Sequence, residues 1–481
     1  MNSIDNVFIY FREISKIPRE TTKEKQISDY LVDFAQKRNL EVHRDQLLNV
    51  IIKKKSNIEN YSGPTVILQG HMDMVYEKSP DSSHVYENGI EIVERDGYVY
   101  ASDKTTLGGD NGIALAYCLA ILDSDEIKHP HLEVIITTQE EGGLAGANAL
   151  NTDSLKGKYL INLDSEEEGV FFTSCAGGVR NNVLIPVEKE EIECRTLLSV
   201  NISGLKGGHS GIEIDRERGN AIKLMGRLLY SIDSPEISMV SLQCPGKANA
   251  ISSSASVLLA VPDEMTGTVT NKIKEVEASF KKELQFTDTI KIECFSAAPV
   301  SSGTINAYTG DVKKKIINTL MLIPYGVMNK SYAIPGLVQT SVNVGSLEES
   351  EHYISILSSI RSSVESQKYN VADTIRVVAE LYGAKCEFFN DYPQWEYKQD
   401  SHLRDLAVRM YEEIFEKKAR LTAIHAGLEC GYFDSKLKNA DIISMGPDLF
   451  EVHTPNEHAS VQSIKNVWVL LLKILEKLAE E

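Results

Sequence analysis

Short apolar segments that alternate with amphipathic stretches constrain the fold of this chain more than any other feature. Three of them, Thr65–Leu68, Leu132–Ile136 and Tyr159–Leu163, have the length of a single strand. A helical stretch from Ile113 to Leu122 lies between the first two, and a further strand is expected at 441–445. Strands that alternate with helices are typical of α/β folds, so we expect a mostly parallel central sheet.

The pattern changes after Gly177-Gly178, which predicts an inserted domain. Its strands alternate apolar and polar residues more strictly, as suits a sheet with one solvated face. Its expected elements are strands at 196–204, 254–262 and 289–295 and helices at 272–284 and 352–366. We therefore expect a catalytic α/β domain at 1–185 and 389–481, interrupted by an inserted α+β domain at 186–388. Whether the two halves of the insertion, 190–290 and 300–388, are similar stays open.

The charge balance of the 481-residue chain excludes several classes of partner. Asp and Glu number 69 against 50 Lys and Arg, which gives a formal net charge of -19 at pH 7. This charge repels phosphate groups, so we expect neither nucleic acid nor an anionic membrane surface as a partner. No segment approaches the roughly 18 uninterrupted apolar residues of a membrane-spanning helix.

Seven scattered cysteines without a CxxC pair favour reduced thiols and a cytoplasmic location. Residues 1–16 lack the basic-then-apolar order of a signal peptide, which agrees with that location. The chain also lacks the GxxxxGK(S/T), GxSxG and strict GxGxxG motifs. The main support for P-loop, α/β-hydrolase and dinucleotide-binding functions is therefore missing.

Polar side chains able to bind a metal follow most of the expected strands. The carboxyl ends of parallel strands meet at one edge of a sheet, so residues that follow them converge there. The clusters are Gln69-Gly-His71-Met-Asp73, Gly108-Gly-Asp110-Asn-Gly, Thr138-Gln-Glu140-Glu141, Leu163-Asp164-Ser-Glu and Glu451-Val-His453. Taken singly, each could be a solvated loop end, whereas together they favour a shared site.

The residue types in these clusters suit a site for two metal ions. Zn²⁺ binds His nitrogens and carboxylate oxygens, usually with four ligands, so two histidines cannot serve two metals without a bridging carboxylate and two more. The candidate ligands are His71, Asp110, Glu141, Asp164 and His453. Glu140 remains as a free carboxylate that could move protons. Asp73 could hold the second nitrogen of His71.

Seven motifs give the chain a resemblance to a known family. They are QGHMDMV (69–75), TTLGGDNG (105–112), TTQEEGG (137–143), INLDSEEEG (161–169), LKGGHSG (205–211), HAGLECG (425–431) and VHTPNE (452–457). Together they are similar to those of cytosolic aminoacyl-histidine dipeptidases, the Xaa-His dipeptidases of the bacterial carnosinase type. These enzymes belong to the dizinc metallopeptidases that include carboxypeptidase G, tripeptidase and aminoacylase. The resemblance runs essentially from end to end.

The resemblance implies that Asp110 bridges two metals. His71 and Asp164 would complete the first metal site, and Glu141 and His453 the second.

It also implies that Glu140 is the general base and that Asp73 holds the nitrogen of His71 that does not bind the metal. Val452 and Asn456 depart from the family pattern, but neither change removes a ligand.

The resemblance further implies that the inserted domain is a lid that contributes to the active site. His209 of the LKGGHSG turn would be its catalytic residue, and Asn249 and Arg361 would contact the substrate. His425, which precedes a Gly-rich turn, would line the substrate pocket.

The implied activity is hydrolysis of dipeptides, such as the Xaa-His dipeptide β-alanyl-histidine, by a hydroxide bridged between two divalent metal ions. Zn²⁺ is the expected metal, with Co²⁺ and Mn²⁺ as alternatives. A small peptide is the expected partner, and a homodimer formed through the lid stays open. Two other functions also stay open: an N-acyl-amino-acid amidohydrolase on the same site, and a non-catalytic metal- or peptide-binding protein.

Overall fold

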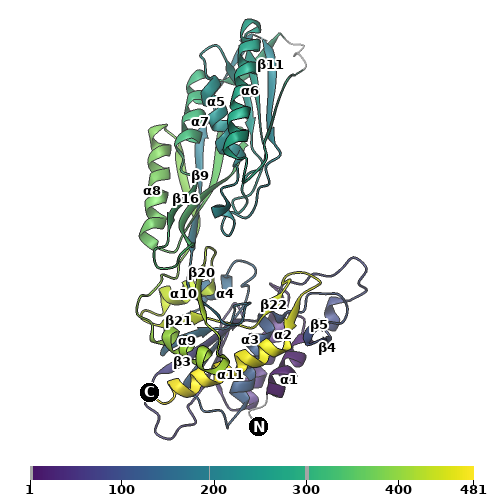
Figure 1. The fold of residues 1–481 in the computed structure, drawn as a ribbon, viewed down its shortest axis with the longest axis vertical. Helices are drawn as coiled ribbons and strands as arrows, with labels where there is room; N and C mark the ends of the chain where they lie inside the picture. Colours follow the sequence, from purple (N-terminus) through teal and green to yellow (C-terminus); the bar gives the residue numbers. More distant parts are fainter. Residues whose placement is uncertain (1–3, 194, 298–302) are drawn as a thin grey trace. The chain divides into compact units, whose positions relative to one another are not determined.

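Residues 4–193, 195–297 and 303–481 are described by the computed structural model, in which the chain divides into two units (Figure 1). Unit 1 comprises Met1–Cys175, Trp395–Ala423 and Leu428–Glu481, and unit 2 comprises Ala176–Gln394 and Ile424–Gly427. The sequence placed the insertion at 186–388 as one continuous segment. In the structure unit 2 begins earlier and ends later, and it also takes the short segment Ile424–Gly427.

Unit 1 is built around one large sheet. Its helices are α1 (Ile4–Ser15), α2 (Lys25–Lys37), α3 (Gly109–Asp123), α4 (Ala145–Ala149), α9 (His402–Phe415), α10 (Glu429–Lys436) and α11 (Val461–Leu478). Its strands are β1 (Glu41–Arg44), β2 (Val50–Lys54), β3 (Thr65–His71), β4 (Ile92–Arg95), β5 (Tyr98–Ala101), β6 (His131–Thr137), β7 (Gly157–Asn162), β8 (Val170–Cys175), β20 (Arg420–Ile424), β21 (Asp441–Ser444), β22 (Leu449–Phe450) and β23 (His458–Ser460).

The large sheet is parallel at its centre. Among the described residues it has eight strands in the order β1-β2-β6-β3-β7-β21-β8-β20, and a smaller sheet has the order β22-β23-β5-β4. Strands β6, β3, β7 and β21 run parallel, while β2 and β8 join them in the antiparallel sense. The expected α/β fold with a mostly parallel central sheet is confirmed.

The parallel register aligns the carboxyl ends of the central strands. His71, the last residue of β3, lies opposite Thr137, the last residue of β6. Gln69 of β3 lies opposite Asn162, the last residue of β7. The loops that follow these strands therefore begin at the same edge of the sheet. Strand β3 is longer than expected, so His71 is the end of the strand itself.

Helix α3 fills the centre of unit 1 because its side chains are almost all apolar. Every residue from Ile113 to Leu122 is buried. The ring of Tyr117 stacks on Trp468 of α11 with centroids 5.9 Å apart. At the carboxyl end of α3, the ammonium group of Lys54 donates to two backbone carbonyls at 3.2 and 3.0 Å, which satisfies groups that a helix end leaves unpaired. Both contacts anchor the helix whose first turn carries a candidate ligand.

Unit 2 contains separate antiparallel sheets covered by helices. Its helices are α5 (Ala221–Ile232), α6 (Thr266–Glu283), α7 (Gly310–Leu322) and α8 (Glu365–Leu381). Its strands are β9 (Gly177–Pro186), β10 (Lys189–Glu193), β11 (Thr196–Ser203), β12 (Ser238–Gln243), β13 (Ala255–Val261), β14 (Lys291–Ser296), β15 (Thr304–Tyr308), β16 (Gly326–Lys330), β17 (Val338–Glu349), β18 (Tyr353–Ser362) and β19 (Lys385–Tyr392).

The sheets of unit 2 have, among the described residues, the orders β12-β13-β11-β14, β16-β17-β18-β9-β19 and β10-β15. Helices α5 and α6 contact the first sheet, and α8 contacts the second. Helices α5 and α7 approach closely at Gly226, where an added Cβ would lie 2.7 Å from the Cβ of Leu320. A glycine is required there because any side chain would push the two helices apart.

The helix expected at 352–366 is wrong, because residues 353–362 form strand β18 and helix α8 begins only at Glu365. Ile354, Ile356 and Ile360 are fully buried and share one face of the strand. Their spacing follows the two-residue period of a strand, and β-branched side chains favour that conformation. The strand is paired on both sides, with β17 and β9, and these partners determine its conformation.

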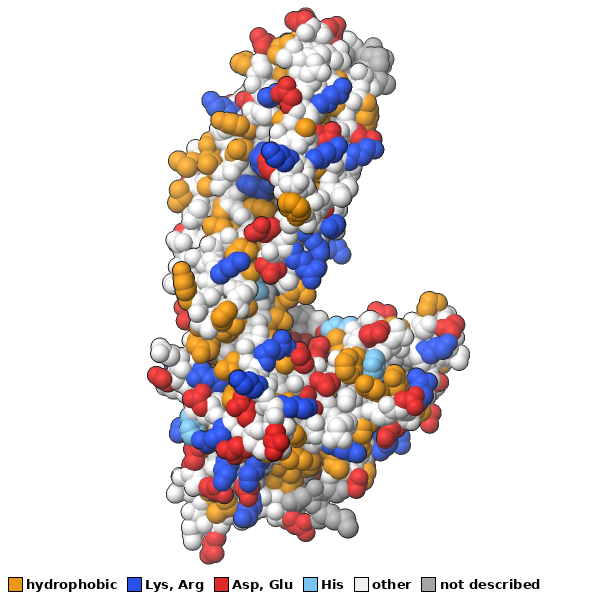
Figure 2. Space-filling model, in the orientation of Figure 1, with side chains coloured by type: hydrophobic (Ala, Val, Ile, Leu, Met, Phe, Trp, Pro, Cys, Tyr) orange, Lys and Arg blue, Asp and Glu red, His pale blue; other side chains and the backbone are white. Residues whose placement is uncertain are grey.

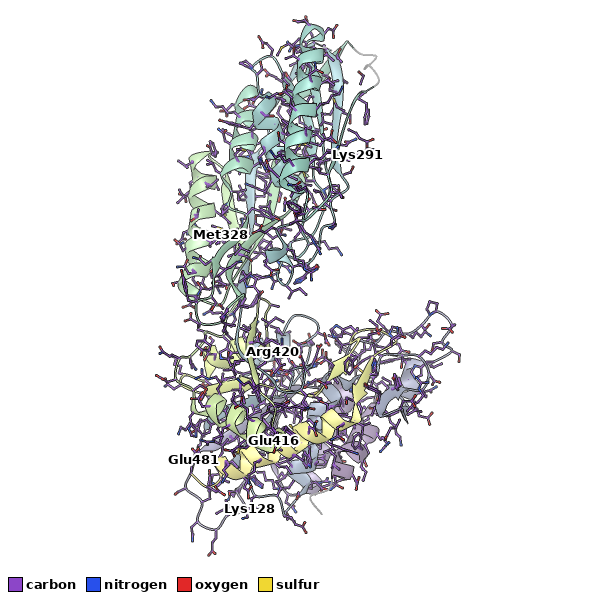
Figure 3. The ribbon with its side chains drawn as sticks, viewed as in Figure 1. Lys128, Lys291, Met328, Glu416, Arg420 and Glu481 are labelled. Atoms are coloured by element: carbon purple, nitrogen blue, oxygen red, sulfur yellow. The ribbon has the colours of Figure 1, made fainter. Side chains whose placement is uncertain are left out.

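The surface of both units mixes charges: acidic and basic side chains are interspersed over the face shown in Figure 2. Glu481, labelled in Figure 3, accepts a hydrogen bond from the hydroxyl of Tyr159 at 3.1 Å, which ties it to β7. None of the described helices is long and apolar enough to cross a membrane. The described cysteines are free, and Cys194 lies outside the described residues.

Candidate functional site

The five candidate metal ligands lie together at one edge of the large sheet in unit 1. His71 ends β3 and is fully buried. Asp110 lies in the first turn of α3, Glu141 and Asp164 follow β6 and β7, and His453 lies between β22 and β23. One potential ligand atom each from His71, Asp110 and Glu141 lies within 4.8 Å of the other two, so these three side chains could hold a metal ion.

Asp110 stands between the two histidines. Its Oδ1 lies 3.0 Å from Nε2 of His71, and its Oδ2 lies 3.2 Å from Nε2 of His453. Oδ1 of Asp164 lies 3.3 Å from the first imidazole nitrogen, and Oε1 of Glu141 lies 2.8 Å from the second. Two ligand atoms on one tetrahedral zinc ion are about 3.4 Å apart, so these spacings fit two neighbouring cations that share Asp110.

The charges around the two imidazoles favour a cation. Burial acts to lower the pKa of His71, but the carboxylates of Asp164 and Asp110 outweigh it and hold that pKa well above its usual value. Hydrogen bonds to Asp110 and Glu141 raise the pKa of His453 to about 10. The carboxylates therefore attract positive charge to both rings. The donor set of imidazole and carboxylate fits a divalent cation in place of those protons.

Asp73 forms more contacts than the single one to His71 that the sequence predicts. Its Oδ1 accepts the backbone N–H of Glu140 at 3.0 Å, and its Oδ2 accepts that of Glu141 at 3.3 Å and the hydroxyl of Thr21 at 2.9 Å. Nδ1 of His71 lies 3.1 Å from the backbone carbonyl oxygen of Asp73 and 3.5 Å from its carboxylate. Asp73 thus holds the turn of Glu140 and Glu141 as well as the imidazole of His71.

A fully buried carboxylate that the sequence analysis gave no role ties the strand ends together. Glu429 accepts a hydrogen bond from Oγ1 of Thr137 at 2.8 Å and from Nε2 of Gln69 at 2.5 Å. Gln69 in turn accepts from the amide of Asn162 at 2.5 Å. These contacts link the ends of β6, β3 and β7 to α10. The signal was present in the HAGLECG motif, in which only His425 received a role.

Unit 2 by itself brings together the residue expected to be catalytic, His209, and the three residues expected to contact substrate. The backbone N–H that follows His209 donates to the carbonyl of Asn249 at 3.0 Å. A Cβ built on Gly211 would lie 3.1 Å from Cε1 of His209, 2.6 Å from the carbonyl oxygen of His425 and 3.2 Å from Nε of Arg361. His209, Arg361 and His425 therefore converge on Gly211, and Asn249 contacts the residue just before it.

The hydrogen bonds of His209 determine which ring nitrogen carries the proton. Its Nδ1 accepts the backbone N–H groups of Gly211 and Ile212, each at 3.2 Å. The proton of the neutral ring is therefore on Nε2, which can donate. Burial, together with the charge of Arg361, lowers the pKa of His209 and so favours the neutral ring. Its backbone N–H donates to Glu213 at 2.8 Å, which fixes the turn.

Arg361 presents a guanidinium group that is only partly paired. Its Nη1 donates to the hydroxyl of Tyr392 at 2.9 Å, whereas its buried Nε has no hydrogen-bond partner among the described residues. Nε2 of His425 lies 2.7 Å from the hydroxyl oxygen of Ser341. Burial, together with the charge of Arg361, lowers the pKa of His425 to about 3. A charged donor beside neutral rings suits an anionic group on a ligand.

The lowered pKa of His425 predicts how acid affects stability. An unfolded histidine titrates near about 6.5, so the neutral ring stabilises the fold above that pH and loses its contribution as pH falls toward 3. Between pH 7 and pH 5 the expected loss is about 2 kcal/mol. Urea denaturation at both pH values should show a smaller loss of unfolding free energy in His425→Asn than in wild type. Equal losses in the two proteins would contradict this prediction.

Comparisons with known proteins agree with the geometry of unit 1. The family described as Peptidase family M20/M25/M40 matches residues 67–477. The chain is 31% identical over 470 residues to the cytosol non-specific dipeptidase of Escherichia coli (strain K12), and the match covers 97% of this chain and 96% of that protein.

Solved structures show the same relationship. The aminoacylhistidine dipeptidase of Vibrio alginolyticus matches with a TM-score of 0.92 and 34% identity, over 99% of this chain and 97% of that one. The aminopeptidase PepT of Bacillus cereus shares the fold, with a TM-score of 0.61 and 17% identity, over 99% of this chain and 98% of that one. The chain therefore belongs to peptidase family M20/M25/M40, and it is a metallopeptidase.

Proposed function

We propose that the protein is a dipeptidase that holds two divalent cations and cleaves Xaa-His dipeptides such as β-alanyl-histidine. The geometry of Asp110 carries the proposal, because its two oxygens face different histidines. The name of the Escherichia coli relative supports a dipeptide substrate in general. The name of the Vibrio alginolyticus relative supports a preference for histidine as the second residue.

The ligands of the two cations are assigned by the contacts of Asp110. His71 and Asp164 would complete one metal site, and Glu141 and His453 would complete the other. Two cations held there would supply a water of lowered pKa and would polarise the peptide carbonyl. Imidazole with carboxylate suits Zn²⁺, with Co²⁺ and Mn²⁺ as alternatives.

Glu140 is the proposed general base. It takes a proton from the attacking water and returns it to the leaving amine. Its backbone N–H is held by Asp73, which also holds the next residue, the proposed ligand Glu141. The base and the ligand therefore share one turn and one anchor, which holds the backbone of both residues in place.

The cluster in unit 2 is proposed to act on the same substrate. His209 donates its Nε2–H to the oxyanion that forms at the cleaved carbonyl, because its Nδ1 is already occupied by two backbone donors. Arg361 binds the carboxylate at the end of the dipeptide through its guanidinium group, which is only partly paired. Asn249 and His425 are further substrate contacts, since both lie in this cluster.

A cytoplasmic location and a homodimer through unit 2 are also part of the proposal. The name of the Escherichia coli relative supports the location. In the part of unit 2 that the structure describes, β14 (Lys291–Ser296) ends its sheet. An edge strand offers backbone groups with which a second copy can pair. Sedimentation of the purified protein would distinguish a dimer from a monomer.

A substrate panel tests the proposed function. The purified protein should release free histidine from β-alanyl-histidine and Ala-His, and a chelator should abolish the release. Zn²⁺, Co²⁺ and Mn²⁺, added one at a time, should restore activity and rank the metals. Turnover of N-acetyl amino acids without any dipeptide would instead indicate an amidohydrolase. Metal binding without any hydrolysis would indicate a binding protein.

Replacement of Glu140 by Gln tests the general base. The amide keeps the size and shape of the side chain but cannot take a proton, so kcat should fall about 10³–10⁴-fold. Elemental analysis should still find the wild-type metal content, because Glu140 is not a proposed ligand. Turnover near that of wild type would exclude Glu140 as the base. Loss of metal along with activity would make it a ligand.

Replacement of His209 by Ala tests the role of unit 2. Loss of an oxyanion donor typically costs about 10²–10³-fold in kcat, and we expect a loss of that size on the best dipeptide. His352→Ala is the matched control, because His352 is an exposed histidine of the same unit. Both variants should keep their metals and their fold. An unchanged kcat in His209→Ala would refute the catalytic role.

A further inference from the structure

The loop 107–110, which ends at Asp110, is held from two sides by buried side chains of opposite charge. Glu457 is 3% exposed and Arg19 is 1% exposed. Both belong to unit 1, and the sequence analysis gave neither a role. Buried charges are rare unless they are paired and hydrogen-bonded, so their shared position around one short loop requires a reason.

Glu457 binds the N–H groups of the loop. Its Oε2 accepts from Leu107 at 2.8 Å and from Gly108 at 3.0 Å, and its Oε1 accepts from Gly109 at 2.8 Å and from Asp110 at 3.3 Å. These groups stand at the amino end of α3, which has no side-chain cap of its own. A carboxylate is favoured there by the unpaired N–H groups and by the helix dipole.

Arg19 binds the carbonyl side of the same loop. Its Nη2 donates to the carbonyl of Gly108 at 2.6 Å. Its Nη1 donates to the carbonyls of Met72 at 3.1 Å and Asp73 at 3.3 Å, directly after the end of β3. Gly108 has a φ of 66°, and an added Cβ would lie 2.6 Å from Nη2 of Arg19. Residue 108 must therefore be glycine, because any side chain there would displace the guanidinium group.

The two side chains connect the segments of three proposed ligands. Arg19 joins the residues that follow His71 to the loop of Asp110. Glu457 joins that loop to the segment of His453, which lies only four residues earlier in the chain. The oxygens of Asp110 must face both histidines at once. A small rotation of the loop would therefore lengthen one of its two contacts.

We infer that Arg19 and Glu457 are positioning residues that hold Asp110 between His71 and His453, and thereby set the affinity of the metal centre. The inference rests on the two-metal site of the proposed function. Residues that orient ligands without touching the metal typically change metal affinity about 10–100-fold when they are replaced. Glu457 and Arg19 orient the bridging ligand itself, so their replacement should weaken the metal centre directly.

Glu133 provides a matched control for Glu457. It is also 3% exposed and also binds backbone N–H groups, those of Lys156 at 2.9 Å and Gly157 at 3.0 Å. These contacts join β6 to the start of β7, at the edge of the sheet opposite the proposed ligands. Glu133→Gln thus removes a similar buried carboxylate from the same unit without touching the loop of Asp110.

The test measures Co²⁺ binding to the full-length metal-free protein by calorimetry and by visible absorption, which reports the geometry of the ligands. Glu457→Gln should bind Co²⁺ at least about 10-fold more weakly than wild type and should change the spectrum. Arg19→Lys, which loses the planar fork, should shift both readouts in the same direction. Glu133→Gln should keep the wild-type affinity and spectrum, even where thermal unfolding shows lower stability.

The outcomes separate the inference from the proposed function. Wild-type affinity and spectrum in Glu457→Gln would overturn the inference alone. Equal loss of affinity in Glu457→Gln and Glu133→Gln would also overturn it, because that result would reflect general destabilisation. A wild-type protein that binds no Co²⁺ would overturn the proposed function as well. If Glu457→Gln is not recovered folded, Glu457→Asp, which keeps the charge but is too short for all four N–H groups, gives the same comparison.

Discussion

The concentration of negative charge at one edge of the large sheet is the constraint on which the rest of unit 1 depends. Asp110, Glu141 and Asp164 meet around the imidazoles of His71 and His453. Like charges this close repel strongly in a buried setting, so the cluster is stable only when positive charge is present. The same carboxylates raise the pKa values of both histidines, so protons on the two rings supply part of this positive charge. Divalent cations would supply more positive charge than these protons.

Much of this centre could be predicted from the sequence because it depends on local signals. Apolar runs indicate the strands, and the rule for parallel sheets places the residues after those strands at one edge. His71 and Asp164 lie at or just after such strand ends, as expected. The same reasoning was wrong for 352–366, which forms strand β18. Its conformation depends on pairing with β17 and β9, which periodicity alone does not reveal.

The contacts that hold the centre in place could not be predicted, because their partners are backbone atoms. Arg19 and Glu457 bind carbonyl and N–H groups of a loop far away in the sequence, and every residue type except proline offers both groups. No side-chain pattern therefore marks the pairing. The residues of unit 2 present a related case: their motifs could be recognised, but only the fold shows that His209, Arg361 and His425 converge on Gly211.

The short segment Ile424–Gly427 has a consequence for how this architecture can be divided and exchanged. It belongs to unit 2 although the residues on both sides of it belong to unit 1. It carries His425, which reaches Ser341, while Glu429, two residues beyond its end, joins the buried network at the ends of β3 and β6. Unit 2 therefore cannot be exchanged as one continuous segment cut at two positions of the chain. A chimera that exchanged residues 176–394 with those of a relative would assemble a hybrid cluster, with His425 inherited from one parent and both His209 and Arg361 from the other.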